Sequence, residues 1–217
     1  MLHDKVIQRE EMRASAFNSL SSLFLFPSSS IQSDAALFSD IIGFLESVDK
    51  RAAEHARMMS DRIATADYQK LAVEFTRLFI GPFGTIAPPY GSFYMEEGRL
   101  MGDSTLKTMD YYIMAGLTKS KDFKDLPDHI SAELEFMYYL VSNEATFLIN
   151  GALDNALEVN SLSESFLEEI LLPWVAPFAK QIKDNTSHEY FTSLADCLLS
   201  FCENCSFDLS REITTNN

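Results

Sequence analysis

Residues 128–149 constrain the fold more than any other segment, because their apolar side chains repeat at the spacing of a helix. The repeats fall at every third or fourth position, which places them on one side of a helix. Aromatic residues widen this stripe, so we expect the helix to be buried on more than one side and covered by several neighbouring elements. The stripe consists of Ile130, Leu134, Met137, Val141, Ala145 and Leu148, and it is widened by Phe136, Tyr138, Tyr139 and Phe147.

The other periodic segments also favour helices. The chain has 217 residues with only 8 Gly and 7 Pro, and no Asn-Gly turn joins two alternating strands. We therefore predict an all-α fold, a multi-helix bundle. Helices are expected over residues 2–26, 34–48, 51–65, 67–79, 93–117, 128–149, 166–182 and 188–201, with Asp34 and Asp67 capping two of them.

Two segments interrupt the helical pattern. Residues 81–92 (GPFGTIAPPYGS) contain three prolines and three glycines and predict a rigid loop. Residues 118–127 are polar and rich in lysine, and they predict a hinge. We expect one domain, with a main lobe over about 1–117, the hinge at 118–127, C-terminal helices over 128–205 and a disordered tail at 212–217.

The charge balance indicates which partners are excluded. Lys and Arg number 17 against 32 Asp and Glu, so the net charge is −15 and no clustered basic face marks a nucleic-acid site. An acidic surface can attract a basic peptide, although solubility alone also explains it. The longest apolar run, residues 170–179, contains Pro173 and Pro177 and is far shorter than the roughly 20 residues that span a bilayer. The N-terminus lacks the apolar region of a secretory signal, so a cytoplasmic protein is predicted.

Signals for metal or covalent chemistry are weak. His129 and Glu133 lie one helical turn apart, as two metal ligands would, but only four histidines exist and no HExxH motif occurs. Cys197, Cys202 and Cys205 have the spacing of part of a ferredoxin ligand set, which needs a fourth thiolate. They also suit a helix core as small apolar residues, and their odd number argues against a disulfide framework. We therefore assign no catalytic residue, no metal site and no cofactor, and a metal or iron–sulfur protein is the least favoured alternative.

Two short segments carry residues suited to binding a peptide. In the loop, Tyr90 and Tyr94 follow two prolines that fix the backbone, and such rigid aromatic surface costs little entropy to order. A packed connection between helices is the alternative. Asp128 can cap the helix that follows it, and His129 in the first turn can form a hydrogen bond with a peptide. A plain cap beside a surface histidine is the alternative here.

Four motifs in a fixed order resemble a known family. The residues are 88–94 (PPYGSFY), 111–117 (YYIMAGL), 127–137 (PDHISAELEFM) and, within 166–178, Phe166-Leu167, Trp174, Pro177 and Phe178. This set is similar to that of the TorD/DmsD-type redox-enzyme maturation chaperones, relatives of the NarJ proteins. One position departs from the family, since many members carry Glu before the Asp-His pair and Asp125 is the nearest acid here.

The resemblance implies an all-helical chaperone without catalytic activity. Such a protein binds the twin-arginine signal peptide of a molybdenum-cofactor oxidoreductase and holds the precursor until the cofactor is inserted. We place the peptide groove between the Tyr90 loop and the helix that starts at Asp128. The expected peptide-binding residues are Tyr90, Ser92, Tyr94, Pro127, Asp128, His129 and Glu133. The family includes domain-swapped homodimers, which a hinge would permit. A helical scaffold that binds a folded oxidoreductase subunit without recognising a signal peptide is the alternative.

Overall fold

The structure, a computed structural model, describes residues 2–29, 31, 34–81, 84–117 and 125–215. These residues form helices and no strand, which confirms the predicted all-α class. The elements are α1 (Leu2–Leu23), α2 (Ala35–Glu46), α3 (Lys50–Thr65), α4 (Tyr68–Phe75), a π-helical turn η2 (Thr76–Ile80), α5 (Gly91–Met95), α6 (Asp103–Met114), α7 (Ile130–Ile149), α8 (Leu153–Phe166), a π-helical turn η3 (Leu167–Leu171), α9 (Leu172–Asn185), α10 (Glu189–Asn204) and α11 (Leu209–Thr215).

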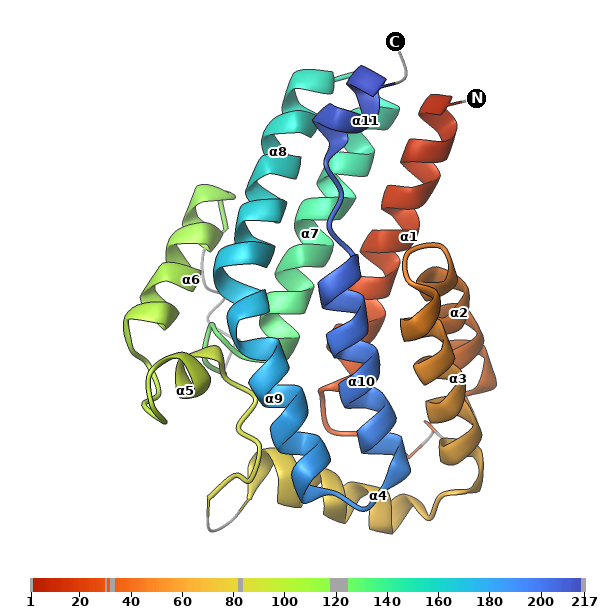
Figure 1. Cartoon of the computed structure of the whole chain (residues 1–217), viewed down its shortest axis with the longest axis vertical. Coiled ribbons are helices and arrows are strands. Elements are labelled where there is room, and N and C mark those ends of the chain that lie inside the picture. Colours follow the sequence, from red (N-terminus) through yellow and green to blue (C-terminus); the bar gives the residue numbers. More distant parts are fainter. Residues whose placement is uncertain (1, 30, 32–33, 82–83, 118–124, 216–217) are drawn as a thin grey trace.

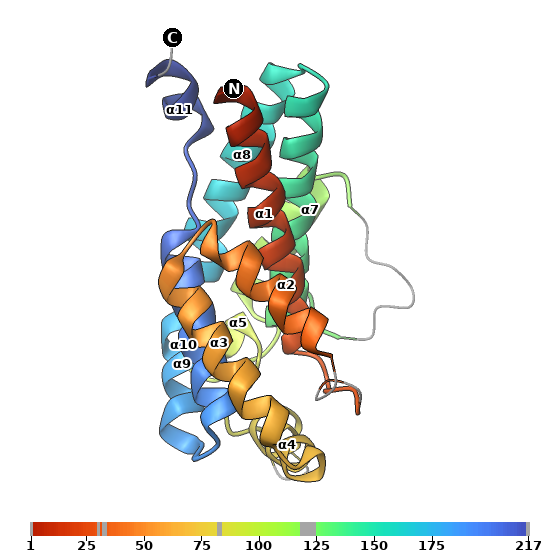
Figure 2. The same cartoon turned by 90° about the vertical axis from the view of Figure 1, so that its right-hand side faces the viewer.

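Helix α7 lies between α1 and α8 and packs against both (Figure 1). A second layer is formed by α10, which packs between α3 and α9, while α2 contacts both α1 and α3. Helix α4 crosses one end of the bundle, at the bottom of Figures 1 and 2. Helices α5 and α6 lie outside this bundle, where α5 contacts α9 and α6 contacts η3. Helix α7 is therefore covered by neighbouring helices on more than one side, as predicted.

One apolar cluster runs through most of the bundle. It joins residues from α1 through α10, and its largest buried side chains include Trp174, Phe17 and Phe166. Each fully buried side chain of this kind contributes about 1.5–3 kcal/mol to folding. A smaller cluster at the end where α11 lies contains Val6 and Phe207. The fold thus depends on contacts between segments far apart in the sequence.

The predicted hinge falls mostly outside the described residues. Residues 118–124 belong to that part of the chain, so the hinge and the division into lobes stay predictions. Residues on both sides of it contribute to one core, because α1 packs directly against α7.

The predicted continuous helix over residues 93–117 is wrong, because a turn separates α5 from α6. Glu97 and Met101 in this turn have positive φ angles of 52° and 57°. The carboxylate of Glu96 accepts hydrogen bonds from the backbone N–H and the hydroxyl of Ser104, at 2.7 and 2.5 Å, and so caps α6. This carboxylate occupies the space that a Cβ at position 102 would take, so a side chain there would displace the flexible end of Glu96 and disturb the cap.

Two helices were not predicted from the sequence. Helix α8 follows α7 after a short turn at Gly151, whose φ of 70° suits glycine. Helix α11 covers residues 209–215, so the predicted disordered tail at 212–217 is wrong for 212–215. Residues 216–217 lie outside the described residues.

A buried ion cluster ties α1 to α7, α8 and the segment after α10. The guanidinium of Arg13 is fully buried and lies 2.8 Å from Glu10, 3.2 Å from Glu144 and 2.8 Å from Glu164. It also donates to the Cys205 carbonyl at 3.1 Å. Burial and the nearby Glu10 carboxyl raise the pKa of Glu144 to about 8, against the opposing effect of Arg13. Arg13 is thus the cation that contacts Glu10, Glu144 and Glu164, while Arg9 also acts on Glu10 through its charge.

We predict that Arg13→Ala destabilises the fold by about 3–5 kcal/mol, because it leaves several buried carboxyl groups without their cation. Urea unfolding followed by circular dichroism measures this loss. Arg57→Ala is the control, since Arg57 forms an exposed ion pair with Glu46 and its loss should cost no more than about 1 kcal/mol. Equal losses in the two variants would contradict the central role of Arg13.

Candidate functional site

The loop before α5 and the segment before α7 are joined by backbone hydrogen bonds. Tyr90 and His129 form an isolated antiparallel bridge. In it the Gly91 N–H donates to the Asp128 carbonyl and the Ile130 N–H donates to the Pro89 carbonyl, both at 2.9 Å. The ring of Tyr90 stands edge-on to the imidazole of His129, with centroids 5.3 Å apart. The two segments expected to flank a groove are therefore in direct contact with each other.

Asp128 does not cap the helix that follows it, contrary to the prediction. Its side chain is buried, and one carboxylate oxygen accepts from the Ser92 N–H at 2.8 Å, at the start of α5. The cap of α7 is His129, whose Nδ1 accepts from the Ser131 N–H at 3.1 Å. Burial lowers the pKa of His129, although Asp125 and Asp128 oppose this shift. A neutral imidazole is the form whose Nδ1 can accept this bond.

Glu133 is fully buried and connects α7 to α9. Its Oε2 accepts from the indole N–H of Trp174 at 3.0 Å. Burial raises the pKa of Glu133 well above its usual value, and the charge of Asp128 raises it further. Tyr94 stacks on the same indole with centroids 5.8 Å apart and an interplanar angle of 14°. A Cβ on Gly91 would lie 2.9 Å from the indole nitrogen, so glycine allows α5 to approach α9 this closely.

The remaining predicted site residues belong to the same buried layer. The carbonyl of Pro127 accepts from the Tyr112 hydroxyl at 2.7 Å and so ties α6 to the segment before α7. Ser92, Pro127, Asp128, His129 and Glu133 are buried, while Tyr90 and Tyr94 are half-buried. The structure thus brings all seven predicted residues together, but as a polar layer that holds α5 and α6 on the bundle. Contact between these residues and a peptide stays a prediction.

An exposed carboxylate lies at the edge of this layer. The hydroxyl of Tyr90 donates to Asp125 at 2.9 Å, and Nε2 of His129 lies 4.0 Å from the other oxygen of Asp125. The Asp125 side chain is 46% exposed. A half-exposed carboxylate can still accept bonds from an added guanidinium, because its two oxygens offer about four acceptor positions.

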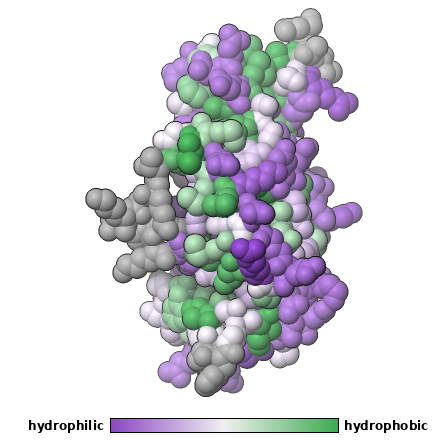
Figure 3. Space-filling view, turned by 90° about the vertical axis from the view of Figure 1, so that its left-hand side faces the viewer, coloured by the Kyte–Doolittle hydropathy of each residue, from purple (hydrophilic) through white to green (hydrophobic). Residues whose placement is uncertain are grey.

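Sequence reasoning missed the apolar outer face of α6, which adjoins this layer. Its exposed side chains lie on the side of α6 opposite Thr105, Thr108 and Tyr111, which are buried. Figure 3 shows apolar residues gathered on this side of the molecule. The signal was present in the sequence, since apolar residues follow helical spacing along both sides of this helix. We define the outer face of α6 as Leu106, Met109, Ile113 and Met114, extended at its N-terminal end by Met95, Leu100 and Met101.

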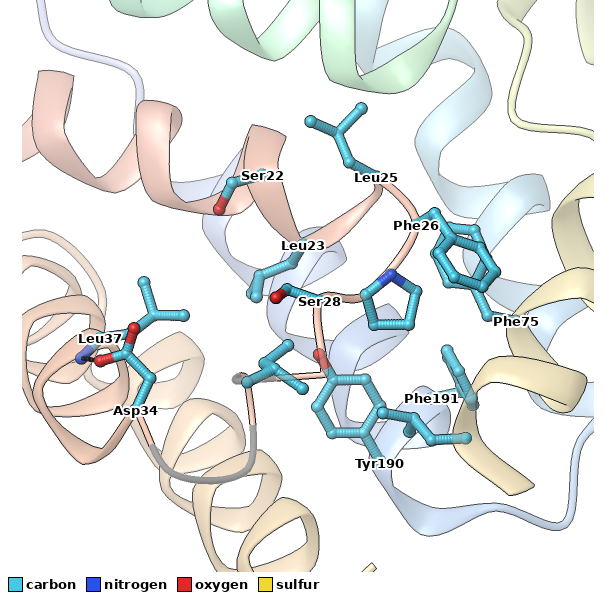
Figure 4. Close-up of a pocket in the computed structure, with 13 residues that line it drawn as sticks. Ser22, Leu23, Leu25, Phe26, Ser28, Asp34, Leu37, Phe75, Tyr190 and Phe191 are labelled. Carbon is cyan, nitrogen blue, oxygen red and sulfur yellow. Dashed lines mark hydrogen bonds between the residues drawn. The ribbon is translucent and has the colours of Figure 1, made fainter. Parts of the chain in front are cut away.

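A separate cavity of about 260 Å³ lies where the end of α1 meets α4 and the start of α10 (Figure 4). Its wall is mainly apolar, and four of its 13 lining residues are aromatic: Phe26, Phe75, Tyr190 and Phe191. Phe26 stands edge-on to Phe75, with centroids 5.7 Å apart, and also lines a second, open hollow that includes Val73. None of the predicted site residues lines either space.

The three cysteines are free and buried in the core. Burial raises the pKa of all three thiols, that of Cys205 to about 12, which disfavours the thiolate that binds metal. Within the described ranges, no three His, Cys, Asp or Glu side chains are grouped so that they could hold a metal ion. Glu133 is bonded to Trp174 rather than paired with His129 as a second ligand would be.

The comparisons with known proteins place the chain in a family. The sequence model of the nitrate reductase delta subunit family matches residues 45–180, more than half of the chain. The chain therefore belongs to this family, which includes the TorD and NarJ proteins, and the predicted relationship is confirmed.

Curated relatives carry the name of the TorD chaperone. The chain is 30% identical over 145 residues to the chaperone protein TorD of Photobacterium profundum, covering 66% of each chain. It is 32% identical over 139 residues to the TorD chaperone of Vibrio atlanticus, covering 62% of this chain and 61% of the relative. The match thus spans slightly less than two thirds of these relatives. The relatives are named as chaperones rather than enzymes, which agrees with the predicted class.

A solved structure has the same fold. The crystal structure of a proposed redox enzyme maturation protein from Archaeoglobus fulgidus superposes with a TM-score of 0.53 at 23% identity, covering 90% of this chain and 94% of the other. In the part of the chain that the structure describes, every helix is too short or too polar to cross a bilayer.

We predict that Glu133→Gln becomes more stable relative to the wild type as the pH rises from 5 to 8. The folded-state pKa of Glu133 is raised, so the native protein binds the proton more tightly than the unfolded chain, and stability falls as the pH rises from about 4.5 through the folded pKa. Glutamine stays neutral and can still accept from Trp174. Urea unfolding at pH 5 and pH 8 gives the difference, which can change by at most about 1.4 kcal/mol per pH unit.

Glu169→Gln is the control for this experiment. Hydrogen bonding from Lys107 lowers the pKa of Glu169, so its contribution to stability is lost only as the pH falls below about 4.5. Its stability difference from the wild type should therefore stay constant between pH 5 and 8. A constant difference for Glu133→Gln as well would show that its carboxyl group is not protonated by burial.

Proposed function

We propose that this chain is a cytoplasmic chaperone that binds the twin-arginine signal peptide of a molybdenum-cofactor oxidoreductase and holds the precursor until its cofactor is inserted. Family membership and the names of the curated relatives support the chaperone class. The single observation that carries the peptide site is the half-exposed carboxylate of Asp125, fixed beside Tyr90 and His129.

Asp125 provides the contact for one arginine of the peptide. A guanidinium donates two parallel hydrogen bonds to a carboxylate, a geometry that an ammonium group lacks. The neutral state of His129 is important here, because an imidazolium 4.0 Å from Asp125 would offset the charge that attracts the arginine. The chain's net charge of −15 adds a long-range attraction that speeds the encounter at low salt.

The buried members of the predicted site act on the peptide indirectly. Asp128 holds the start of α5 through Ser92, and Glu133 holds Trp174, on which Tyr94 stacks. Pro127 holds α6 through Tyr112. These residues are therefore positioning residues, while Tyr90, His129 and Asp125 present atoms at the edge of the layer.

We predict that Asp125→Asn weakens binding of a synthetic twin-arginine peptide by about tenfold, because it removes a charge-assisted pair. Isothermal titration calorimetry at 50 mM and 300 mM NaCl provides the affinities. The wild-type affinity should fall at the higher salt concentration, and the difference between wild type and Asp125→Asn should shrink as the charges are screened.

Glu203→Gln is the matched control, because it removes one exposed negative charge from α10, on an element that carries none of the predicted site residues. A peptide with two lysines in place of the arginines tests the bidentate contact. It should bind wild type more weakly than the arginine peptide does, whereas Asp125→Asn should bind the two peptides with similar affinity. Failure of the wild-type protein to bind any twin-arginine peptide would disprove the proposed function. Binding that is equal for wild type and Asp125→Asn would leave the function standing and remove Asp125 from the site.

A further inference from the structure

Helix α6 has apolar residues on two opposite sides, and only one of them is covered. Its inner side packs on the bundle, where the ring of Tyr112 contacts Phe136 with centroids 4.6 Å apart and Tyr111 contacts Phe166 at 5.3 Å. On its outer face, Leu106, Ile113 and Met114 are 60%, 64% and 61% exposed. Leu106, Met109 and Ile113 are neighbours at helical spacing and form an apolar patch of the kind that marks a binding surface, while the exposed Asp110 lies between Leu106 and Met114.

The outer face of α6 is rich in methionine. Four of the nine methionines in the chain, Met95, Met101, Met109 and Met114, lie on it. Methionine side chains are flexible and polarisable, so they adapt to partners whose apolar residues differ in size. This composition suits a partner that is defined by its hydrophobicity rather than by one exact sequence.

Acidic residues border this face. Asp110 lies one turn from both Leu106 and Met114, and Glu97 and Asp103 are exposed at the N-terminal end of the helix. Residues 95–114 contain two basic residues, of which Lys107 is held by Glu169 at 2.7 Å and Arg99 is exposed, against three exposed carboxylates. The surface is therefore complementary to an apolar segment that carries arginine or lysine beside it.

Dimensions and backbone geometry indicate how such a segment would bind. Helix α6 has 12 residues and is about 18 Å long. The apolar region of a signal peptide has about 7–15 residues, which as a helix spans a similar length. No strand edge is present among the described residues, so an added strand has nothing to pair with. Packing of a helical segment along α6 is the mode that the length and exposed face of this helix suit.

We infer that the outer face of α6 binds the apolar region of the client's signal peptide as a helix, with the basic residues of the peptide facing the carboxylates around it. This inference rests on the function proposed above and adds the surface that recognises the apolar part of the peptide. The buried layer at Asp128 and Glu133 then serves to hold α5 and α6 in place, and Asp125 contacts an arginine.

The test uses the full chain with Leu106→Gln and Ile113→Gln combined, and a synthetic peptide that has two arginines followed by about 12 apolar residues. Both substitutions are at exposed helix positions and keep good helix formers, so circular dichroism and the thermal midpoint should stay close to wild type. The affinity for the peptide should fall at least about tenfold. Val73→Gln is the control, because Val73 is 67% exposed on α4, outside this face, and its loss should leave the affinity unchanged.

A second peptide, with alanines in place of half of its apolar residues, separates contact from indirect effects. It should bind wild type more weakly, yet lose little further affinity in the double variant, because the two changes remove the same contact. Losses that simply add would overturn the inference. If wild type binds the first peptide and the double variant binds it equally well, the inference is wrong while the proposed function stands. If wild type binds no such peptide, the proposed function itself is wrong.

A second copy of the chain is the other candidate to cover the outer face of α6, and sedimentation velocity tests for such a dimer. A wild-type dimer that the double variant converts to a monomer, at unchanged peptide affinity, would assign the face to a second copy of the chain and overturn the inference. A monomer in both proteins, together with the loss of peptide binding, supports it.

Discussion

The need to partner buried carboxyl groups on and next to α7 organises the whole bundle. Asp128, Glu133 and Glu144 are all buried along this segment, and each is bonded to a different element. Asp128 accepts a hydrogen bond from the backbone at the start of α5, and Glu133 accepts one from Trp174 of α9. Glu144 accepts hydrogen bonds from Arg13 of α1 and Asn160 of α8. Burying a polar group without a partner costs several kcal/mol, so the arrangement that gives each of the three at least one partner excludes most alternative packings. One oxygen of Asp128 and one of Glu133 are buried without a hydrogen bond from the described residues. Apolar contacts supply most of the stability, while these bonds select which helices are neighbours.

Local signals in the sequence predicted the helices that depend on local chemistry. Asp34 and Asp67 cap α2 and α4 as expected, accepting from the N–H groups of Leu37 and Gln69 at 2.9 Å. Helix α8 was missed because Asn160 and Ser163 lie at its buried positions, which breaks the apolar stripe on which prediction relies. Asn160 is buried because it donates to Glu144 and to the Phe207 carbonyl, contacts 16 and 47 residues away. No local pattern contains that information.

The sequence motifs identified the site residues, but they did not indicate that most of these residues are buried. A helix start with Asp before His looks the same in sequence whether the aspartate caps its own helix or another one. Here the cap of α5 comes from Asp128, 36 residues further along the chain, because the Tyr90–His129 bridge brings the two segments together. That bridge depends on Gly91, since a side chain there would collide with Trp174. The roles of these residues follow from tertiary contacts among three helices, which periodicity and capping rules do not address.

This division between buried and exposed groups changes how substitutions in the site should be interpreted. Loss of Asp128 or Glu133 would loosen the contacts that hold α5 and α6 on the bundle. Both the outer face of α6 and Asp125 would then shift from their positions. Under the proposed arrangement, in which both residues act through α5 and α6, peptide binding and stability would then fall together. Loss of Leu106, Ile113 or Asp125 leaves the core intact and should affect affinity alone. A residue that contacts the peptide is therefore identified by a change in affinity without a change in unfolding free energy, and a positioning residue by changes in both.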